Sequence, residues 1–347
     1  MFDLPGLIKS PVKLASIEIL KNGSIFFVRT RSTADAVGIT GTKQVEDFLP
    51  IFERLVAPRF IGKDARQLKT LINDVYRANY KLAGLPFWCP VAYLEQSLLD
   101  LLGKVPPQAR RRVARRHRQN RDPLLSLRFG SHSHRRQEVD VYVCGVAETG
   151  AKSVKFKIGG RMSCNLDAYP SRTEKLLKLA REKLGDKVIL RADANGSYDA
   201  PHGIRIGRML EDLGETQAVA DALHIPIAYG EQNCSLWQFD WTLRNGVMKI
   251  AQPDINYIGR LIRTKRGARI AEKFGCTIVP HNTQTGATSV NIVQFSSCTN
   301  NTGPFMEYPW RAPPKAPTWF KPDFKIVDGK PKPRPRPTWA WKSILTS

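Results

Sequence analysis

Two short stretches decide how we interpret this chain: Val154-Lys155-Phe156-Lys157-Ile158-Gly159 and Arg191-Ala192-Asp193-Ala194-Asn195. Each places charged or polar side chains at the end of an apolar run of strand-like composition. Four later segments repeat the arrangement with one ionisable residue each, namely Glu231, Asp254, His281 and Glu307. Ionisable residues at the carboxyl ends of successive strands are typical of barrel enzymes. The six segments together predict a (β/α) barrel.

Helices and strands alternate after residue 138. Helical patterns at 139–149, 172–184, 203–223 and 261–274 are interleaved with strand-like runs at 153–158, 188–192, 225–229, 248–251, 277–279 and 305–307. Such alternation favours a parallel sheet with crossover helices. We therefore place the barrel domain at residues 138–310.

The first 103 residues follow a different pattern. Apolar runs at 14–20 and 25–29 flank Asn22-Gly23, a strong hairpin signal. Helical patterns follow at 45–55, 64–82 and 91–102, and we expect Asp64 to cap the second and Gly84 to end it. The pattern predicts a small α+β domain at residues 1–103.

The formal net charge of +23 is concentrated in two segments. Residues 104–137 form an atypical basic segment, in which eleven Lys or Arg residues oppose the single acid Asp122. Residues 311–347 form a C-terminal return segment that ends in a basic, proline-rich tail. A basic nucleic-acid-binding protein is the less favoured alternative, because the first basic segment has no interleaved aromatic residues to stack bases.

The six cysteines are scattered and form no C-x-x-C pair, a usage typical of reduced thiols in a cytoplasmic protein. No apolar run approaches the roughly 18 residues that a membrane span requires. We expect a soluble cytoplasmic protein without a membrane partner. The sequence leaves open whether it forms a homo-oligomer.

The ordered set resembles the enolase superfamily and, within it, the mandelate racemase subgroup of the mandelate racemase and muconate lactonizing enzymes. Lys155-Phe156-Lys157 resembles the K-x-K motif of the subgroup, and Asp193-Ala194-Asn195 resembles its first metal-ligand strand. Residues 1–103 resemble the capping domain, including its helix at 93–103. The resemblance covers most of the chain and implies a modified TIM barrel with an N-terminal α+β capping domain.

Three later residues or pairs complete the resemblance. Glu231 is similar to the last metal ligand, Asp254 with His281 to the Asp-His dyad, and Glu307 to the acid that hydrogen-bonds the substrate carboxylate. Taken singly, Asp254 could cap a helix, His281 could lie in a turn, and Glu307 could be a surface acid. We weigh them as a set.

The resemblance implies Mg²⁺-dependent abstraction of the proton α to a carboxylate, through an enediolate that the metal charge stabilises. Lys157 would be a base, because a nearby metal and Lys155 disfavour its charged form. Lys155, Asn195 and Glu307 would bind the substrate. His281, oriented by Asp254, would act from the opposite face as acid or base. We expect dehydration of an acid sugar, or else racemisation or epimerisation.

The metal ligands depart from this pattern. The subgroup has a third carboxylate in a Glu-Glu-Pro type segment, which this chain lacks, leaving Asp193 and Glu231. These two are 38 positions apart, where two βα units need about 50 residues. The nearby acids Glu211, Asp212 and Glu215 lie in a helical pattern typical of a solvated face. We therefore predict a missing barrel strand and weak Mg²⁺ binding, and keep a degenerate, non-catalytic family member as the alternative.

Two further positions bear on the barrel. Residues 124–129 lie within the basic segment, yet their apolar composition allows them to form the first barrel strand. Arg260 follows Gly259 where the resemblance leads us to expect a second glycine. Its long cationic side chain is therefore expected near the site.

Overall fold

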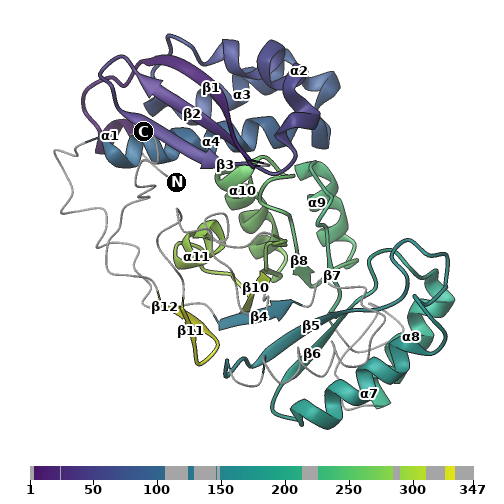
Figure 1. Cartoon of the computed structure of the whole chain (residues 1–347). Coiled ribbons are helices and arrows are strands. Elements are labelled where there is room, and N and C mark those ends of the chain that lie inside the picture. Colours follow the sequence, from purple (N-terminus) through teal and green to yellow (C-terminus); the bar gives the residue numbers. More distant parts are fainter. Residues whose placement is uncertain are drawn as a thin grey trace.

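The computed structural model describes residues 4–23, 25–105, 124–128, 146, 149–212, 226–283, 290–309 and 325–332. The chain forms an N-terminal domain, purple to blue in Figure 1, above a larger domain in teal, green and yellow. Among these residues no helix combines the length and apolar character needed to cross a membrane.

A three-stranded antiparallel sheet opens the N-terminal domain. It consists of β1 (Leu14–Asn22), β2 (Ile25–Ser32) and β3 (Val37–Gly41), in that order. Asn22 pairs with Ile25 across the turn. The hairpin predicted from Asn22-Gly23 is therefore confirmed, since these residues supply the backbone freedom that a tight turn requires.

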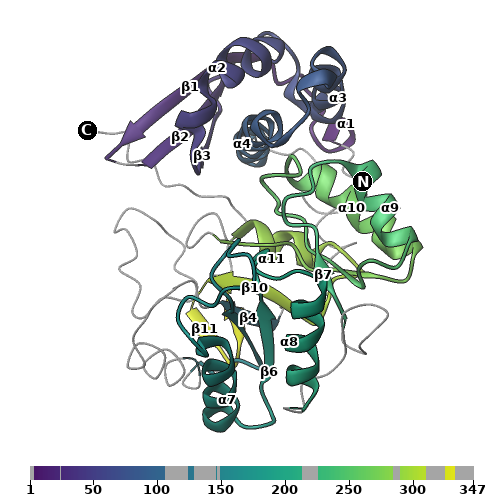
Figure 2. The ribbon, with the colours of Figure 1, turned by 90° about the vertical axis from the view of Figure 1, so that its right-hand side faces the viewer.

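Helix α4 (Leu85–Lys104) packs against this sheet, as Figure 2 shows. Gly38 of β3 permits the close approach, because a Cβ atom there would lie 1.9 Å from the Ser97 carbonyl oxygen of α4. The helix begins earlier than the predicted range of 91–102. The expectation that Gly84 ends the preceding helix is wrong, because that helix already ends at Ala78 and Gly84 is the N-cap of α4.

The region between sheet and α4 is less regular than predicted. Instead of one helix at 45–55, short turns of different helix types follow one another, and Pro50 and Pro58 each remove a backbone donor there. Asp64 does act as a cap, since its Oδ1 accepts from the Arg66 N–H at 3.1 Å. Helix α1 (Leu4–Leu7) precedes the sheet. The elements between the sheet and α4 are η1 (Val45–Phe48), α2 (Leu49–Ile51), η2 (Phe52–Val56), η3 (Ala57–Arg59), η4 (Ala65–Gln67), α3 (Leu68–Ala78) and η5 (Tyr80–Leu82).

The larger domain contains two parallel sheets. The first has the order β10 (Phe305–Pro309), β4 (Leu124–Arg128), β5 (Ser153–Lys157) and β6 (Ile189–Asp193). The second has the order β7 (Ala228–Tyr229), β8 (Ile250–Ala251) and β9 (Thr277–Ile278). Strand β4 confirms the expectation for residues 124–129, so the first sheet takes a strand from within the basic segment.

Five helices of the larger domain lie in the described ranges: α7 (Arg172–Leu184), α8 (Ala200–Asp212), α9 (Leu236–Arg244), α10 (Arg260–Lys273) and α11 (Val290–Ser297). Helices α7 and α8 lie beside β5 and β6 (Figure 1). The sequence reasoning missed α9 and α11. A short hairpin of β11 (Lys325–Val327) and β12 (Lys330–Lys332) follows.

The two sheets share one hydrophobic core. Val154 and Phe156 of β5 belong to the same buried cluster as Ala251 of β8 and Ile278 of β9, and Met306 of β10 also joins it. The cluster also contains Leu176 and Ala180 of α7, so the strands and a covering helix pack in one continuous core. The domain is therefore one body although its strands form two hydrogen-bonded sheets.

The predicted missing strand falls at the break between these sheets. In the part of the chain that the structure describes, β6 pairs with β5 and β7 pairs with β8, and no ladder joins β6 to β7. Residues 213–225, including Glu215, lie outside the described residues, as do most of 104–137, most of the helix predicted at 139–149, and the tail 333–347. The missing strand therefore stays a prediction.

Candidate active site

Parallel pairing brings the two predicted lysines to Asp193. Lys157 is the last residue of β5 and lies directly opposite Asp193, the last residue of β6. Lys155 precedes Lys157 by two positions, so both side chains leave the strand on the same face. Both lysines are buried, with 6% and 4% of their surface exposed. The strand ends thus concentrate charge inside the barrel.

Asp193 holds both ammonium groups. Its Oδ2 lies 2.6 Å from Lys157 Nζ and 3.0 Å from Lys155 Nζ. Burial raises the pKa of the Asp193 carboxyl, but Lys155 and Lys157 together hold that pKa well below its usual range. Lys157 Nζ also donates to Asn195 Oδ1. Asp193 is therefore an ionised carboxylate at neutral pH.

The second sheet carries the His-Asp pair. Asp254 follows β8 and His281 follows β9, and the two form a parallel bridge. His281 Nδ1 lies 3.1 Å from Asp254 Oδ2, while Asp254 Oδ1 accepts from the Asn256 N–H at 2.7 Å. Asp254 does not cap a helix, since the N-cap of α10 is Gly259; one of its oxygens holds the following turn and the other contacts the imidazole. The other imidazole nitrogen, Nε2, lies 3.0 Å from Glu231 Oε2.

Glu307 joins the two groups of side chains. Its Oε1 forms an ion pair with Lys155, and its Oε2 accepts from the backbone N–H of Asn282 at 2.7 Å. The same Oε2 lies 3.9 Å from His281 Nε2. Since the Glu307 side chain is fully buried, it forms a fixed bridge between the sheets. The eight residues predicted from sequence therefore meet in one connected network.

Asp193 and Glu231 are the two carboxylates that would hold Mg²⁺. The residues described here contain no group of three or more His, Cys, Asp or Glu side chains that could hold a metal ion. Carboxylate and amide oxygens from Asp193, Glu231 and Asn195 do suit a hard cation. In this structure, however, Asp193 is paired with Lys155 and Lys157, which occupy the position that a cation would need.

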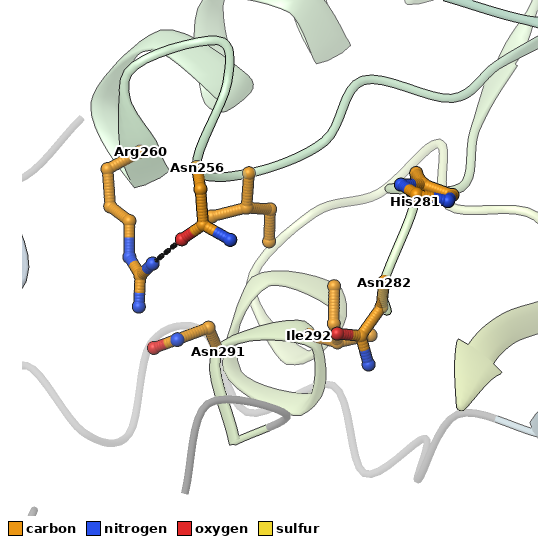
Figure 3. A pocket seen from close by; sticks show the side chains of 7 residues that line it. Asn256, Arg260, His281, Asn282, Asn291 and Ile292 are labelled. Atoms are coloured by element: carbon orange, nitrogen blue, oxygen red, sulfur yellow. Dashed lines mark hydrogen bonds between the residues drawn. The ribbon is translucent and has the colours of Figure 1, made fainter. Parts of the chain in front are cut away.

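A small pocket adjoins the dyad. It is lined by Ile255, Asn256, Arg260, His281, Asn282, Asn291 and Ile292, and its volume of about 10 Å³ is room for about one water molecule. Figure 3 shows Arg260 and Asn291 on one side and His281 and Asn282 on the other. The sequence reasoning placed Arg260 near the site but missed Asn256, Asn282 and Asn291. Asn282 directly follows His281, which was the one available signal.

Solved structures share this architecture. A structure from Roseobacter denitrificans is 24% identical, with a TM-score of 0.82 and 94% of each chain covered. A mandelate racemase/muconate lactonizing protein from Paracoccus denitrificans PD1222, complexed with magnesium, is 24% identical, with a TM-score of 0.78 and 92% of each chain covered. These similarities show the fold to be an α/β TIM barrel with an N-terminal capping domain.

The chain is also similar in sequence to two dehydratases and to one family model. The Arabinonate dehydratase of Saccharolobus solfataricus is 21% identical over 94% of this chain and 87% of its own length. The D-galactonate dehydratase of Variovorax paradoxus is 25% identical over 64% of this chain, which spans 61% of that protein. The family model described as Enolase C-terminal domain-like matches residues 141–337, more than half of the sequence. The chain therefore belongs to the Enolase C-terminal domain-like family, among the mandelate racemase and muconate lactonizing proteins of the enolase superfamily.

Proposed function

We propose that this protein removes the proton α to the carboxylate of an acid sugar and eliminates water from it. The observation that carries the proposal is the chain of contacts that runs from Lys157 to the dyad. It passes through Asp193, Lys155 and Glu307 and ends at the Asp254-His281 pair. Two proton-transfer groups on different sheets can address opposite faces of one substrate. The names of the dehydratase relatives support an acid sugar as the substrate class.

On the first sheet, Lys157 acts as the base. Its Nζ, once deprotonated, takes the proton from the α carbon of the substrate. Asn195 and Asp193 fix that nitrogen from two sides, which limits the geometries it can adopt. Lys155, held by Asp193 and Glu307, lies beside it as a fixed cation for the substrate carboxylate.

On the second sheet, His281 acts as the acid. Asp254 accepts from Nδ1, so Nε2 is the nitrogen that faces the reacting groups. Nε2–H gives its proton to the hydroxyl on the β carbon, which leaves as water while the carbon–carbon double bond forms. The resulting enol tautomerises to a 2-keto-3-deoxy acid. Return of a proton from Nε2 to the α carbon would instead give racemisation or epimerisation.

Mg²⁺ belongs to the proposal as the family's cofactor. Asp193 and Glu231 would hold it, and when bound it would supply positive charge against the charge that develops on the substrate carboxylate. With two carboxylates and no third among the described residues, we expect binding to be weak. Weak binding makes activity dependent on a high Mg²⁺ concentration.

The test is formation of a 2-keto-3-deoxy acid from a panel of sugar acids that includes arabinonate, galactonate and galactarate, with excess Mg²⁺. We expect product with at least one acid, and loss of product with Lys157→Met. Lys178→Met is the matched control, because Lys178 is an exposed lysine of α7 paired with Glu174. Equal activity of both variants would contradict the role of Lys157.

A degenerate, non-catalytic protein is the second candidate. The two-carboxylate metal set favours it, because Lys155 and Lys157 already satisfy Asp193 without an ion. In that case no acid in the panel yields a keto acid at any Mg²⁺ concentration. Heat stability would then also be unchanged by Mg²⁺, whereas the enzyme proposed above gains stability from it.

A further inference from the structure

Arg260 is a buried cation held in an uncommon backbone conformation. It is the first residue of α10, its φ is 72°, and the preceding Gly259 has a φ of 91°. A non-glycine residue in the left-handed region is uncommon and carries backbone strain. The Arg260 side chain is among the largest fully buried ones, since 2% of the residue is exposed.

Neutral groups hold the guanidinium in place. Its Nε donates to Gln96 Oε1 of α4 at 3.1 Å, and its Nη1 donates to Asn256 Oδ1. Nη2 is buried and has no hydrogen-bond partner within the described parts of the chain. No carboxylate oxygen of those parts lies within 4.0 Å of Arg260. Burial lowers the pKa of Arg260 to about 10, although the nearby Glu95 and Asp254 carboxyls act in the opposite direction.

A buried cation without a direct ion pair is a costly feature unless an anion comes into contact with it. Arg260 lines the same pocket as His281, the proposed acid (Figure 3). The pocket has room for about one oxygen-sized group, and Asn282 adds a polar wall. Lys155, the proposed partner of one substrate carboxylate, lies on the other side of Glu307, so Arg260 is a second cationic position.

We propose that Arg260 binds a second, terminal carboxylate of the substrate through Nη2, so that the site selects sugar diacids over sugar monoacids. The inference rests on the proposed function and specifies its substrate class. One carboxylate oxygen in the small pocket accepts from Nη2, and Gln96 and Asn256 hold the guanidinium for it. A neutral terminal hydroxyl gives Nη2 no charge-assisted hydrogen bond and therefore binds less well.

The experiment measures the dissociation constants of galactarate and galactonate by calorimetry in saturating Mg²⁺. The two acids differ at the terminal carbon, which is a carboxylate in the first and a hydroxymethyl group in the second. We expect the native protein to favour galactarate by about tenfold or more, the value of one charge-assisted hydrogen bond. Arg260→Gln should lose most of this preference.

Two further variants keep the test decisive. Arg269→Gln removes an exposed charge from the same helix and should leave the preference unchanged, which excludes a general charge effect. Arg260→Gly relieves the left-handed backbone, so it retains the fold if Arg260→Gln does not, and should also lose the preference. Equal affinity for both acids in the native protein, or an unchanged preference in the Arg260 variants, overturns the inference alone. Binding of neither acid overturns the proposed function with it.

Discussion

The two sheets of the barrel divide the site unequally. The four-stranded sheet has five-residue strands, and all five residues of β5 are buried. It carries Lys155, Lys157 and Glu307. The three-stranded sheet is built from two-residue strands, and both residues of β7 are exposed. It presents Asp254 and His281 from the loops that follow its strands.

The difference separates two parts of the proposed chemistry. Proton removal and carboxylate binding depend on the firmly packed sheet, while proton donation depends on the shorter one. The two are connected through Glu307, which contacts Lys155 on one side and Asn282 and His281 on the other. Each sheet can therefore be perturbed separately, and the following variants do so.

Substitution of the two proton-transfer groups has the largest expected effect. Lys157→Met and His281→Asn should each reduce dehydration by about 10² to 10⁴, the usual contribution of a positioned acid or base. The two should differ in deuterium exchange at the α carbon, because Lys157→Met removes the base and His281→Asn keeps it. NMR of the substrate in deuterated water measures this. Loss of exchange in both variants to the same extent would contradict the division between the sheets.

Asp254→Asn should reduce the turnover number by a smaller factor, of about 10², which is near the lower end for groups that act in proton transfer. The amide still offers Oδ1 to the Asn256 N–H, so the turn is retained. With Oδ1 held by Asn256, the amide NH₂ of the variant faces His281 Nδ1. It cannot accept a hydrogen bond there, so the orientation of the imidazole is lost. The turnover number and its pH profile measure the change. An unaltered pH profile would show that Asp254 serves the turn alone.

Backbone amide exchange compares the sheets directly. We expect the amides of β8 and β9 to exchange roughly tenfold faster or more than those of β5, because shorter ladders open at lower free energy. Mass spectrometry of exchanged peptides measures both in one sample. Equal protection would show that the shared core, rather than ladder length, sets local stability.

The smallest effect that we expect is the gain in stability from Mg²⁺ binding. At about ten times its dissociation constant, it should stabilise the fold by about 1.4 kcal/mol, detectable in thermal unfolding. Asp193→Asn should remove most of this gain. Asp240→Asn is the matched control, because Asp240 pairs with Arg244 on the surface of α9. Equal stabilisation of both variants would place the ion elsewhere.

The sequence predicted the network well because its residues mark strand ends. The register of β5 and β6 places Lys157 opposite Asp193, which follows once the two runs are identified as neighbouring parallel strands. The bridge by Glu307 was not predicted in detail. It depends on a backbone N–H of Asn282, and backbone donors carry no sequence signal.

Some elements were missed for physical reasons. In α9, Phe239 and Leu243 are buried while Trp237 and Trp241 are exposed, so large apolar side chains lie on both faces and blur the helical period. The helix predicted at 45–55 is instead a series of short turns, and Pro50 within that range lacks the backbone donor that a continuous helix would need. The apolar pattern of strand β4 is hard to identify in the sequence because arginines surround it. Its position in the fold is determined by pairing with β5 and β10.

The most direct test of the account is deuterium incorporation at the α carbon of sugar acids in deuterated water, with excess Mg²⁺ and the native protein. We predict exchange with at least one acid of the panel, and its loss in Lys157→Met but not in Lys178→Met. An absence of exchange with every acid would contradict the account and favour a non-catalytic relative that keeps the barrel and its ion pairs.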